Sequence, residues 1–479
     1  MKRVAVLNVV GLTEFLLSPQ HTPQLWSFRQ RNHLCRVEPA FPAVTCTAQA
    51  NYLTGQTASR HGIVGNGWYN RELAEVQFWK QSNHLVQAPK LWEDLRQTVP
   101  NFTCAKLFWW FNMYSSADWS ITPRPIYTAD GRKIFDIYTH PYSIRPAIKK
   151  DIGEFPFATF WGPAAGVETP AGPPDAASRW IADAARWIEE KYRPDLSLIY
   201  LPHLDYNFQR FGPPALPGRD ANFQSARFNP EVAMDLKRVD KIAGELITFL
   251  EGRGVQPVVV SEYGITAVSR TVHLNRLFRE QGWLSIKDEL GREILDCGAC
   301  RVFAVADHQI AHVYLNDTGL EPAVRNLLER TEGINTVLGA AEKKAIGLEH
   351  PRAGDLVAVA EENSWFSYYY WNDDRRAPDF ARTVDIHRKP GYDPVELFLD
   401  ASQPFLKGKI LWRLLQKRLG FRMLMDVIPL DAGLVGGSHG CRPANPLNYP
   451  IFIGPKLQPD LPVVIKSTDV HGLLKRIIL

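Results

Sequence analysis

The sequence predicts an α/β fold, with a doubly wound, mainly parallel sheet flanked by helices. Along the N-terminal half, short runs of buried-type apolar residues alternate with amphipathic helical stretches. Strand–helix–strand units of this length place helices on both faces of a parallel sheet. Ligands of such sheets bind at the carboxyl ends of the strands, so polar residues there are the first candidates for a functional site.

The individual elements follow from the spacing of apolar residues. The first strand is the apolar run 4–10, and two more are expected at 196–201 and 258–260. Residues 174–192 and 232–250 carry apolar side chains at helical spacing on one face, which predicts two helices packed on the sheet. Polar residues and no small-residue cleavage site follow the first run, so we expect a buried strand there and no signal peptide.

Two regions interrupt this alternation. Residues 108–162 are dense in aromatic residues, Pro and Gly, and residues 280–385 mix short strand-like pieces with a helix. We predict an α/β core of residues 1–279 and 386–479, an inserted cap at 280–385, and an aromatic lid segment at 108–162 within the core. Both irregular regions are expected to cover the edge of the sheet.

Composition narrows the class of protein. The 479 residues include 55 Lys and Arg against 51 Asp and Glu, and the formal net charge is +4. Without a Lys/Arg run, this charge excludes a nucleic-acid-binding face and leaves a small anionic ligand. No apolar run approaches the about 18 residues of a membrane span, so no membrane partner is expected. Six cysteines are too few for a disulfide scaffold, which predicts a cytoplasmic location. No feature of the sequence decides the oligomeric state.

The stretch from Phe41 to Gly55 carries the main chemical signal. A Pro-bearing loop leads to Thr45, and a helix of about ten residues then ends at Gly55, which places Thr45 at a helix N-terminus. A hydroxyl at that position gains from the positive end of the helix dipole, which stabilises an alkoxide or a bound phosphate. The structural alternative is that Thr45 is a helix N-cap.

This stretch resembles the nucleophile segment of the type I phosphodiesterase/nucleotide pyrophosphatase family in the alkaline phosphatase superfamily. Thr45, Thr54-Gly55, His61-Gly62-Ile63 and Asn66 match the family pattern in order and spacing. The resemblance implies an alkaline-phosphatase-like core in which Thr45 attacks phosphorus and Asn66 donates to the phosphoryl oxygens. Later in the chain, Asp205, the segment 261–264 and His439 continue the match.

The family also needs two zinc-type ions, and this sequence departs from the family's ligand set. Val10, Gln209, Glu262 and Tyr263 stand where the family has Asp, His, Asp and His. The resemblance with these departures disfavours a dinuclear zinc site. One divalent ion, Mg, Mn or Zn, remains possible, with oxygen donors favouring Mg or Mn. Its predicted ligands are Asp205, Gln209, Glu262 and His439.

Other assignments of the metal site stay open. Asp307, His308, His312 and His387 are either additional ligands from the cap side or hydrogen-bonded structural groups. A third interpretation is that no metal binds and that the scaffold serves another chemistry or binding. Polar residues predominate at the predicted strand ends, which favours a pocket that is still functional, because buried polar groups without partners are costly.

The lid segment offers candidates for substrate binding. Trp109 and Trp110 present flat faces on which a base or an apolar tail stacks, and Arg124 can pair with phosphate or carboxylate. The alternative is that the aromatic residues of this segment form a small core under a long loop.

The sequence therefore predicts a hydrolase that cleaves a phosphodiester, phosphomonoester or pyrophosphate bond in a small phosphorylated molecule through Thr45. The first alternative is a catalytically altered or inactive homologue that binds a phosphorylated small metabolite. The second is an isomerase or mutase of the superfamily that acts on a phosphosugar, or a hydrolase of a non-phosphoryl bond, for which the sequence offers no positive feature.

Overall fold

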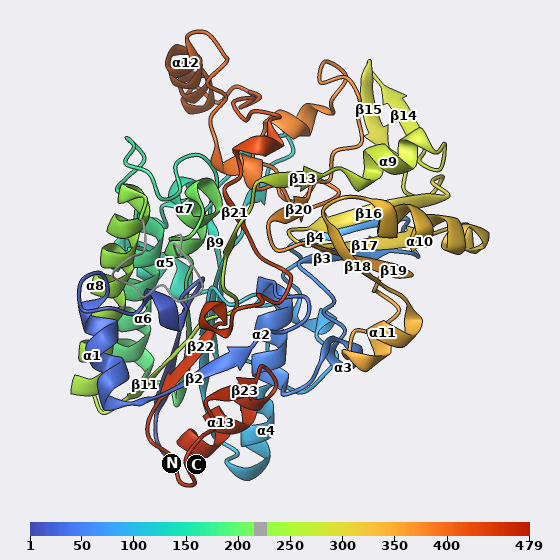
Figure 1. Cartoon of the computed structure of the whole chain (residues 1–479). Coiled ribbons are helices and arrows are strands. Elements are labelled where there is room, and N and C mark those ends of the chain that lie inside the picture. Colours follow the sequence, from blue (N-terminus) through green and yellow to red (C-terminus); the bar gives the residue numbers. More distant parts are fainter. Residues whose placement is uncertain (215–227) are drawn as a thin grey trace.

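The computed structural model describes residues 1–214 and 228–479 and is built around a nine-stranded sheet (Figure 1). Five neighbouring strands, β11, β1, β10, β5 and β6, run parallel, and antiparallel pairings join β22 and β9 to the two sides of this group. This arrangement confirms the predicted fold class. In sheet order the strands are β23 (Val464–Lys466), β2 (His33–Glu38), β22 (Ile451–Gly454), β11 (Gln256–Val260), β1 (Val4–Val9), β10 (Leu196–Leu201), β5 (Cys104–Leu107), β6 (Trp119–Pro123) and β9 (Ile137–His140).

Helices cover both faces of this sheet (Figure 1). The two predicted amphipathic helices are α6 (Ala176–Tyr192) and α8 (Pro230–Gly252), which pack on each other and on the sheet, together with α1 (Pro23–Arg31) and α5 (Ile144–Ile152). The other layer holds α2 (Thr45–Thr54), α4 (Leu91–Thr98) and α13 (Asp469–Ile478). Strand β1 lies between these layers, and its six residues, all apolar except Asn8, are buried.

The segment 108–162 adds to the sheet, which differs from the expectation of a lid. It supplies β6 and β9 at the sheet edge, the helix α5, and a hairpin of β7 (Ile126–Tyr127) and β8 (Lys133–Ile134). Trp109 is fully buried in the main core. Trp109 thus contributes to packing, since a large ring gains most when it is removed from water.

Residues of the predicted cap form a second, four-stranded antiparallel sheet, ordered β16 (Val302–Asp307), β17 (Ile310–Leu315), β19 (Leu356–Ala360) and β18 (Ile334–Leu338). The hydrophobic core around this sheet also includes residues on either side of 280–385, such as Phe278 and Tyr392. The cap boundaries therefore stay a prediction. The turn between β16 and β17 meets the C-terminal loop, where the Gln309 N–H donates to the His439 carbonyl at 2.9 Å.

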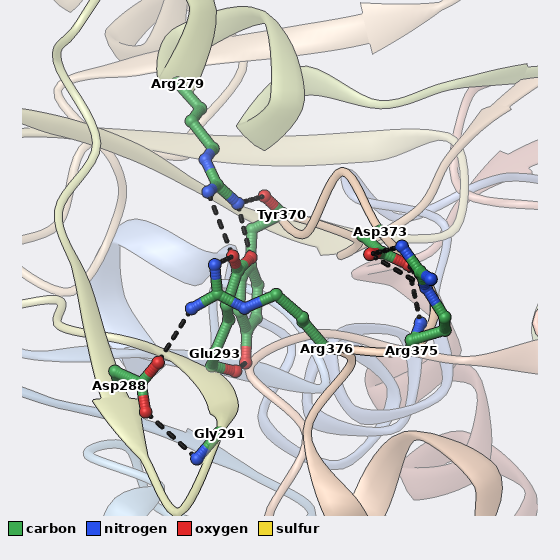
Figure 2. A network of polar contacts seen from close by, with 8 residues as sticks. All are labelled: Arg279, Asp288, Gly291, Glu293, Tyr370, Asp373, Arg375 and Arg376. Carbon is green, nitrogen blue, oxygen red and sulfur yellow. Dashed lines mark hydrogen bonds and ion pairs between the residues drawn. The ribbon is translucent and has the colours of Figure 1, made fainter.

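A hairpin of β14 (Ile286–Glu289) and β15 (Arg292–Leu295) is fixed to this second unit by a buried carboxylate (Figure 2). Glu293 accepts from Arg279 at 2.5 Å and pairs with Arg376 at 3.3 Å. A separate pair, Arg375 with Asp373, lies at the surface beside it. The two arginines neutralise a carboxylate that is otherwise out of contact with water.

Among the described residues, no helix is both long and apolar enough to cross a bilayer. Shorter helices and strands complete the described chain. They are α3 (Ala58–His61), β3 (Gly67–Asn70), β4 (Glu75–Phe78), α7 (His203–Phe211), β12 (Thr266–Ala267), β13 (Arg270–Val272), α9 (Leu274–Glu280), α10 (Glu321–Arg330), α11 (Ala340–Ala345), β20 (Ser364–Phe366), α12 (Leu406–Arg418) and β21 (Gly437–Ser438).

Candidate active site

Thr45 is the first residue of α2, as the sequence predicts. The N-cap residue is Val44, and no side chain caps this helix. The Thr45 hydroxyl is therefore not used for capping, and its Oγ1 lies 3.2 Å from the hydroxyl oxygen of Tyr263. The helix ends at Gly55, whose φ of 66° is left-handed and favours glycine.

Tyr263 connects Thr45 to Asp205. Its hydroxyl donates to Oδ1 of Asp205 at 3.2 Å. A tyrosine hydroxyl has a single proton, so Thr45 must be the donor in its own contact with Tyr263. Burial raises the pKa of Asp205 to about 7, although the hydrogen bonds from Tyr263 and Gln209 act in the opposite direction. The three side chains form a hydrogen-bonded row that leads from the hydroxyl of Thr45 to a carboxyl group that titrates near neutrality.

Gln209 stands one helical turn after Asp205 on α7. Its Nε2 donates to Oδ2 of Asp205 at 2.8 Å, and its Oε1 accepts from the hydroxyl of Tyr392 at 2.9 Å. Both ends of the amide are therefore hydrogen-bonded within the protein, and each oxygen of Asp205 accepts a hydrogen bond.

Glu262 directly follows β11 and is completely buried. Its Oε1 accepts from Asn8 at 2.5 Å and from Gln49 at 2.6 Å. Burial raises the pKa of Glu262 to about 8, which is the dominant cause and outweighs the lowering by these hydrogen bonds. The Oε1 of Gln49 accepts from the backbone N–H of Trp110 at 2.7 Å, so Gln49 joins Glu262 to the segment that follows β5.

His439 lies in a stack of rings. Its Nδ1 donates to the carbonyl of Ala43 at 2.8 Å, and its Nε2 is 4.0 Å from Oδ1 of Asp205. Tyr263 stacks on one side with ring centroids 3.5 Å apart, and His308 lies 3.7 Å away. Burial lowers the pKa of His439 well below its ordinary value. The imidazole is therefore neutral, with its unprotonated nitrogen near Asp205.

Asn66 is held by the cap. Its Nδ2 donates to Oδ1 of Asp307 at 3.0 Å, and its backbone N–H donates to Oδ2 at 2.8 Å. Its Oδ1 accepts from the backbone N–H of Cys46 at 3.0 Å. The amide has a second N–H, which is available to a phosphoryl oxygen. Burial raises the pKa of Asp307 to about 6.

The four predicted metal ligands do not form a ligand set in this arrangement. Asp205 and His439 approach each other, but both oxygens of Asp205, the oxygen of Gln209 and Oε1 of Glu262 accept hydrogen bonds from protein groups. Oε2 of Glu262 and Nε2 of His439 are buried without a hydrogen-bond partner among the described residues. Within residues 1–214 and 228–479, no group of three His, Cys, Asp or Glu side chains is placed to hold an ion. The donors as arranged do not fit a divalent ion, and the single-ion site stays a prediction.

The remaining candidates divide between the site and other places. Asp307 and His308 reach the site, whereas His312 is bound to the backbone at Val64 and Gly354, and His387 to the carbonyl of Phe78. Of the predicted substrate-binding residues, Trp109 is fully buried in the main core, the ring of Trp110 lies 4.6 Å from that of Trp79, and Arg124 is exposed. Trp109 has no face open to a ligand here, because its ring packs inside the core.

Two contributors to the site were not predicted from the sequence. Gln49 stands four residues after Thr45, so the helical repeat places both on one face of α2. This spacing is a signal in the sequence from which Gln49 could have been predicted. Tyr392 follows a Pro-Gly turn in the segment after the cap and has no local signal.

The fold and the polar side chains at its strand ends define an alkaline-phosphatase-like α/β protein. The chain belongs to the type I phosphodiesterase/nucleotide pyrophosphatase family, whose model matches residues 4–393. This match confirms the resemblance found in the sequence and assigns the chain to a family of hydrolases.

A relative and two solved structures are consistent with this assignment. An uncharacterised pyrophosphatase/phosphodiesterase of Schizosaccharomyces pombe is 24% identical over 282 residues, 57% of this chain and 47% of the relative. The chain thus spans about half the length of the curated relative that it matches. Murine ectonucleotide pyrophosphatase/phosphodiesterase 5, an inactive threonine-to-alanine variant in complex with AMP, is 15% identical with a TM-score of 0.57, and the match covers 100% of this chain and 95% of that one. Phosphonoacetate hydrolase from Sinorhizobium meliloti in complex with phosphonoacetate is 14% identical with a TM-score of 0.59, covering 100% and 96%. The structural likenesses show the fold.

Proposed function

We propose that this protein hydrolyses a phosphoester or phosphoanhydride bond of a small molecule, with Thr45 as the nucleophile. The observation that carries the proposal is the row from Thr45 through Tyr263 to Asp205, with contacts of 3.2 Å and 3.2 Å. The family membership supports it, and so does the inactive threonine-to-alanine variant of the murine relative.

In the proposed step, Oγ1 of Thr45 forms a bond to phosphorus while the bond from phosphorus to the leaving oxygen breaks. The proton of Thr45 moves to the oxygen of Tyr263 as Tyr263 passes its own proton to Asp205. The free N–H of Asn66 and the N-terminus of α2 stabilise the charge on the phosphoryl oxygens. Water then hydrolyses the phosphorylated threonine, and the leaving oxygen takes up a proton.

The sequence also predicts one divalent ion, and the proposed step does not include it. Binding one ion through Asp205 and Gln209 would require the hydroxyls of Tyr263 and Tyr392 to leave their oxygens, whereas Oε2 of Glu262 and Nε2 of His439 have no partner to lose. A divalent ion, when bound, would polarise the phosphoryl oxygens and lower the pKa of the nucleophile.

The proposed substrate is a small phosphorylated molecule. The bound AMP and phosphonoacetate of the two structural relatives support this class. We also infer a cytoplasmic location, supported by the six cysteines, all of which are free thiols.

Substitution of Thr45 tests the proposal. Aryl phosphate mono- and diesters are offered to the wild type, to Thr45→Ala and to Thr45→Ser across several divalent metals. We expect Thr45→Ala to abolish turnover and Thr45→Ser to keep part of it, since serine retains a hydroxyl at the same helix terminus. Unchanged turnover in Thr45→Ala would contradict the role of Thr45.

The packing of the site favours one alternative function. The rings of Tyr263, His439, His308 and Tyr392 lie one against the next, with centroids 3.5 to 3.7 Å apart, beside the carboxyl group of Asp205. A protein with a filled site of this kind can bind a phosphorylated metabolite without cleaving it. Inactivity toward all esters, together with a rise in Tm on adding phosphate, would favour this binding function.

A further inference from the structure

The helix α12 exposes its apolar side to solvent. None of its residues is buried. Leu411, Trp412, Leu414 and Leu415 are 70%, 58%, 50% and 44% exposed, and Leu419 beyond the helix end is 65% exposed. Figure 1 shows α12 standing out from the rest of the molecule at the end where α7 lies. A surface helix normally turns its apolar stripe to the core, so this face lacks the partner that would cover it.

The side of α12 that faces the protein combines cations with Leu406 and Ile410, which are partly buried against the core of the second sheet. Lys409 pairs with Asp426 at 2.8 Å, and Arg413 lies 3.9 Å from the same carboxylate. The Nζ of Lys417 lies 4.4 Å from the ring centroid of Phe135, just after β8. The helix is therefore attached through its cations and these two apolar residues, whereas Leu411, Trp412, Leu414 and Leu415 stay exposed to solvent.

The charge around this apolar face has one sign. Between Asp400 and Asp426 the sequence contains six basic residues and no acidic residue. Two of the basic residues, Lys407 and Arg418, are exposed beside the apolar face. Phe405 and Phe421, at the two ends of the helix, are 92% and 62% exposed. Aromatic and aliphatic side chains mixed with Lys and Arg are typical of helices that lie in the headgroup region of a membrane.

The hairpin of β7 and β8 extends this surface. Ile126, Tyr127, Ile134 and Phe135 are 40%, 57%, 43% and 40% exposed. The guanidinium of Arg422 packs on Gly131 at the turn of the hairpin, which holds the two segments together. Two segments that are far apart in the sequence thus present apolar and basic groups on one surface.

We propose that α12 and the β7–β8 hairpin form a surface that docks on a membrane containing anionic phospholipids. The apolar side chains enter the headgroup region, and the basic side chains bind the lipid phosphates and carboxylates. From the sequence we expect no membrane partner, because no apolar run is long enough to span a bilayer. The proposed surface would lie on the bilayer without crossing it. The proposal is independent of the proposed hydrolysis, because it uses none of the residues of the Thr45 site.

Flotation of the full chain with vesicles tests this proposal. We expect binding to vesicles of phosphatidylcholine mixed with phosphatidylserine, weaker binding to phosphatidylcholine alone, and loss of binding as salt is added. The variant Leu411→Ser/Trp412→Ser/Leu415→Ser should lose binding. The variant Lys407→Gln/Arg418→Gln should bind more weakly by about fivefold for each charge removed.

A matched control is Leu290→Ser, since Leu290 is 104% exposed at the tip of the β14–β15 hairpin and away from α12. It should bind vesicles like the wild type. Thermal unfolding should be the same in all variants, because the substituted side chains are exposed. No binding to the anionic vesicles, or equal binding by the triple serine variant, would overturn the proposal. A wild type that ignores vesicles but forms dimers that the triple variant loses would overturn it in favour of a second copy of the chain.

Discussion

The hydroxyl of Tyr263 lies 3.2 Å from Oδ1 of Asp205 and donates to it, while the same hydroxyl lies 3.2 Å from the Oγ1 of Thr45. Tyr263 also fills the space next to His439, with the two rings inclined by 8°. Tyr263 thus connects Thr45, the proposed nucleophile, with a carboxyl group.

The first prediction concerns this connection. Tyr263→Phe keeps the ring stack on His439 but removes the hydroxyl, so the proton of Thr45 loses its acceptor. We expect kcat toward an active ester to fall about 10²- to 10⁴-fold, the usual contribution of general base catalysis. Tyr392→Phe, which removes a hydrogen bond to Gln209 and none to Thr45, is the control and should lose less. A Tyr263→Phe variant with the kcat of the wild type would refute the connection.

The second prediction is the pH dependence of activity. Asp205 accepts a proton only when it is ionised, and burial raises its pKa to about 7. Hence kcat/KM of the wild type should rise as the pH increases through about 7 and level off above it. In Asp205→Asn the rise should disappear together with most of the activity. A profile that keeps its rise near pH 7 in that variant would assign the titration to another group.

The local structure around Thr45 could be predicted because its signals are local. The loop that contains Pro42 ends before Thr45, and Gly55 follows Thr45 by ten residues. These two signals set the bounds of α2, and the structure places the helix at Thr45–Thr54. The strands β1 and β10 were likewise predicted from continuous apolar runs. Such runs identify strands that are buried on both faces.

The interior of the site could not be predicted from the sequence, because its contacts join distant segments. Glu262 is bound by Asn8 and Gln49, which are 254 and 213 residues away in the chain. No periodicity links such residues. Trp109 shows a second limit, since an aromatic residue in an irregular segment has the same sequence signal in a core as over a pocket. Only its complete burial assigns it to the core.

The third prediction concerns stability and Glu262. Burial raises the folded-state pKa of this group from 4.5 to about 8. Between these values the native state binds a proton that the unfolded state releases, so stability falls as pH rises toward 8. Glu262→Gln keeps a neutral amide that accepts from Asn8 and Gln49, and it removes this loss. In urea unfolding, the free energy of unfolding of the variant should increase relative to that of the wild type by at most about 1.4 kcal/mol per pH unit in that window. Stability curves that stay parallel from pH 5 to about 8 would contradict the raised pKa.

The fourth prediction concerns metal ions. In the wild type, both oxygens of Asp205 already accept hydrogen bonds, and no three His, Cys, Asp or Glu side chains of the described residues are placed to hold an ion, so we expect Zn²⁺ to leave Tm unchanged. The variant Gln209→His/Tyr263→His adds two imidazoles beside Asp205 and His439 and thus offers a zinc-type ligand set. Zn²⁺ at about 100 times its Kd should stabilise that variant by about 2.7 kcal/mol. Equal stabilisation of the wild type, or one ion per chain in its elemental analysis, would instead support the single-ion site predicted from the sequence.

The fifth prediction compares the ion pair of Arg279 and Glu293 with that of Arg375 and Asp373, both drawn in Figure 2. The side chain of Glu293 is 4% exposed and is bound by Arg279 and Arg376, whereas the side chain of Arg375 is 90% exposed and binds Asp373. Arg279→Ala removes the shortest bond to a buried carboxylate, which should lower the free energy of unfolding by about 1.5–3 kcal/mol. Arg375→Ala should leave the urea midpoint unchanged, since solvent already screens its pair. If both variants lost the same stability, burial would not be what makes the Glu293 pair stronger. Loss in Arg279→Ala alone would show that this carboxylate anchors the β14–β15 hairpin to the second sheet.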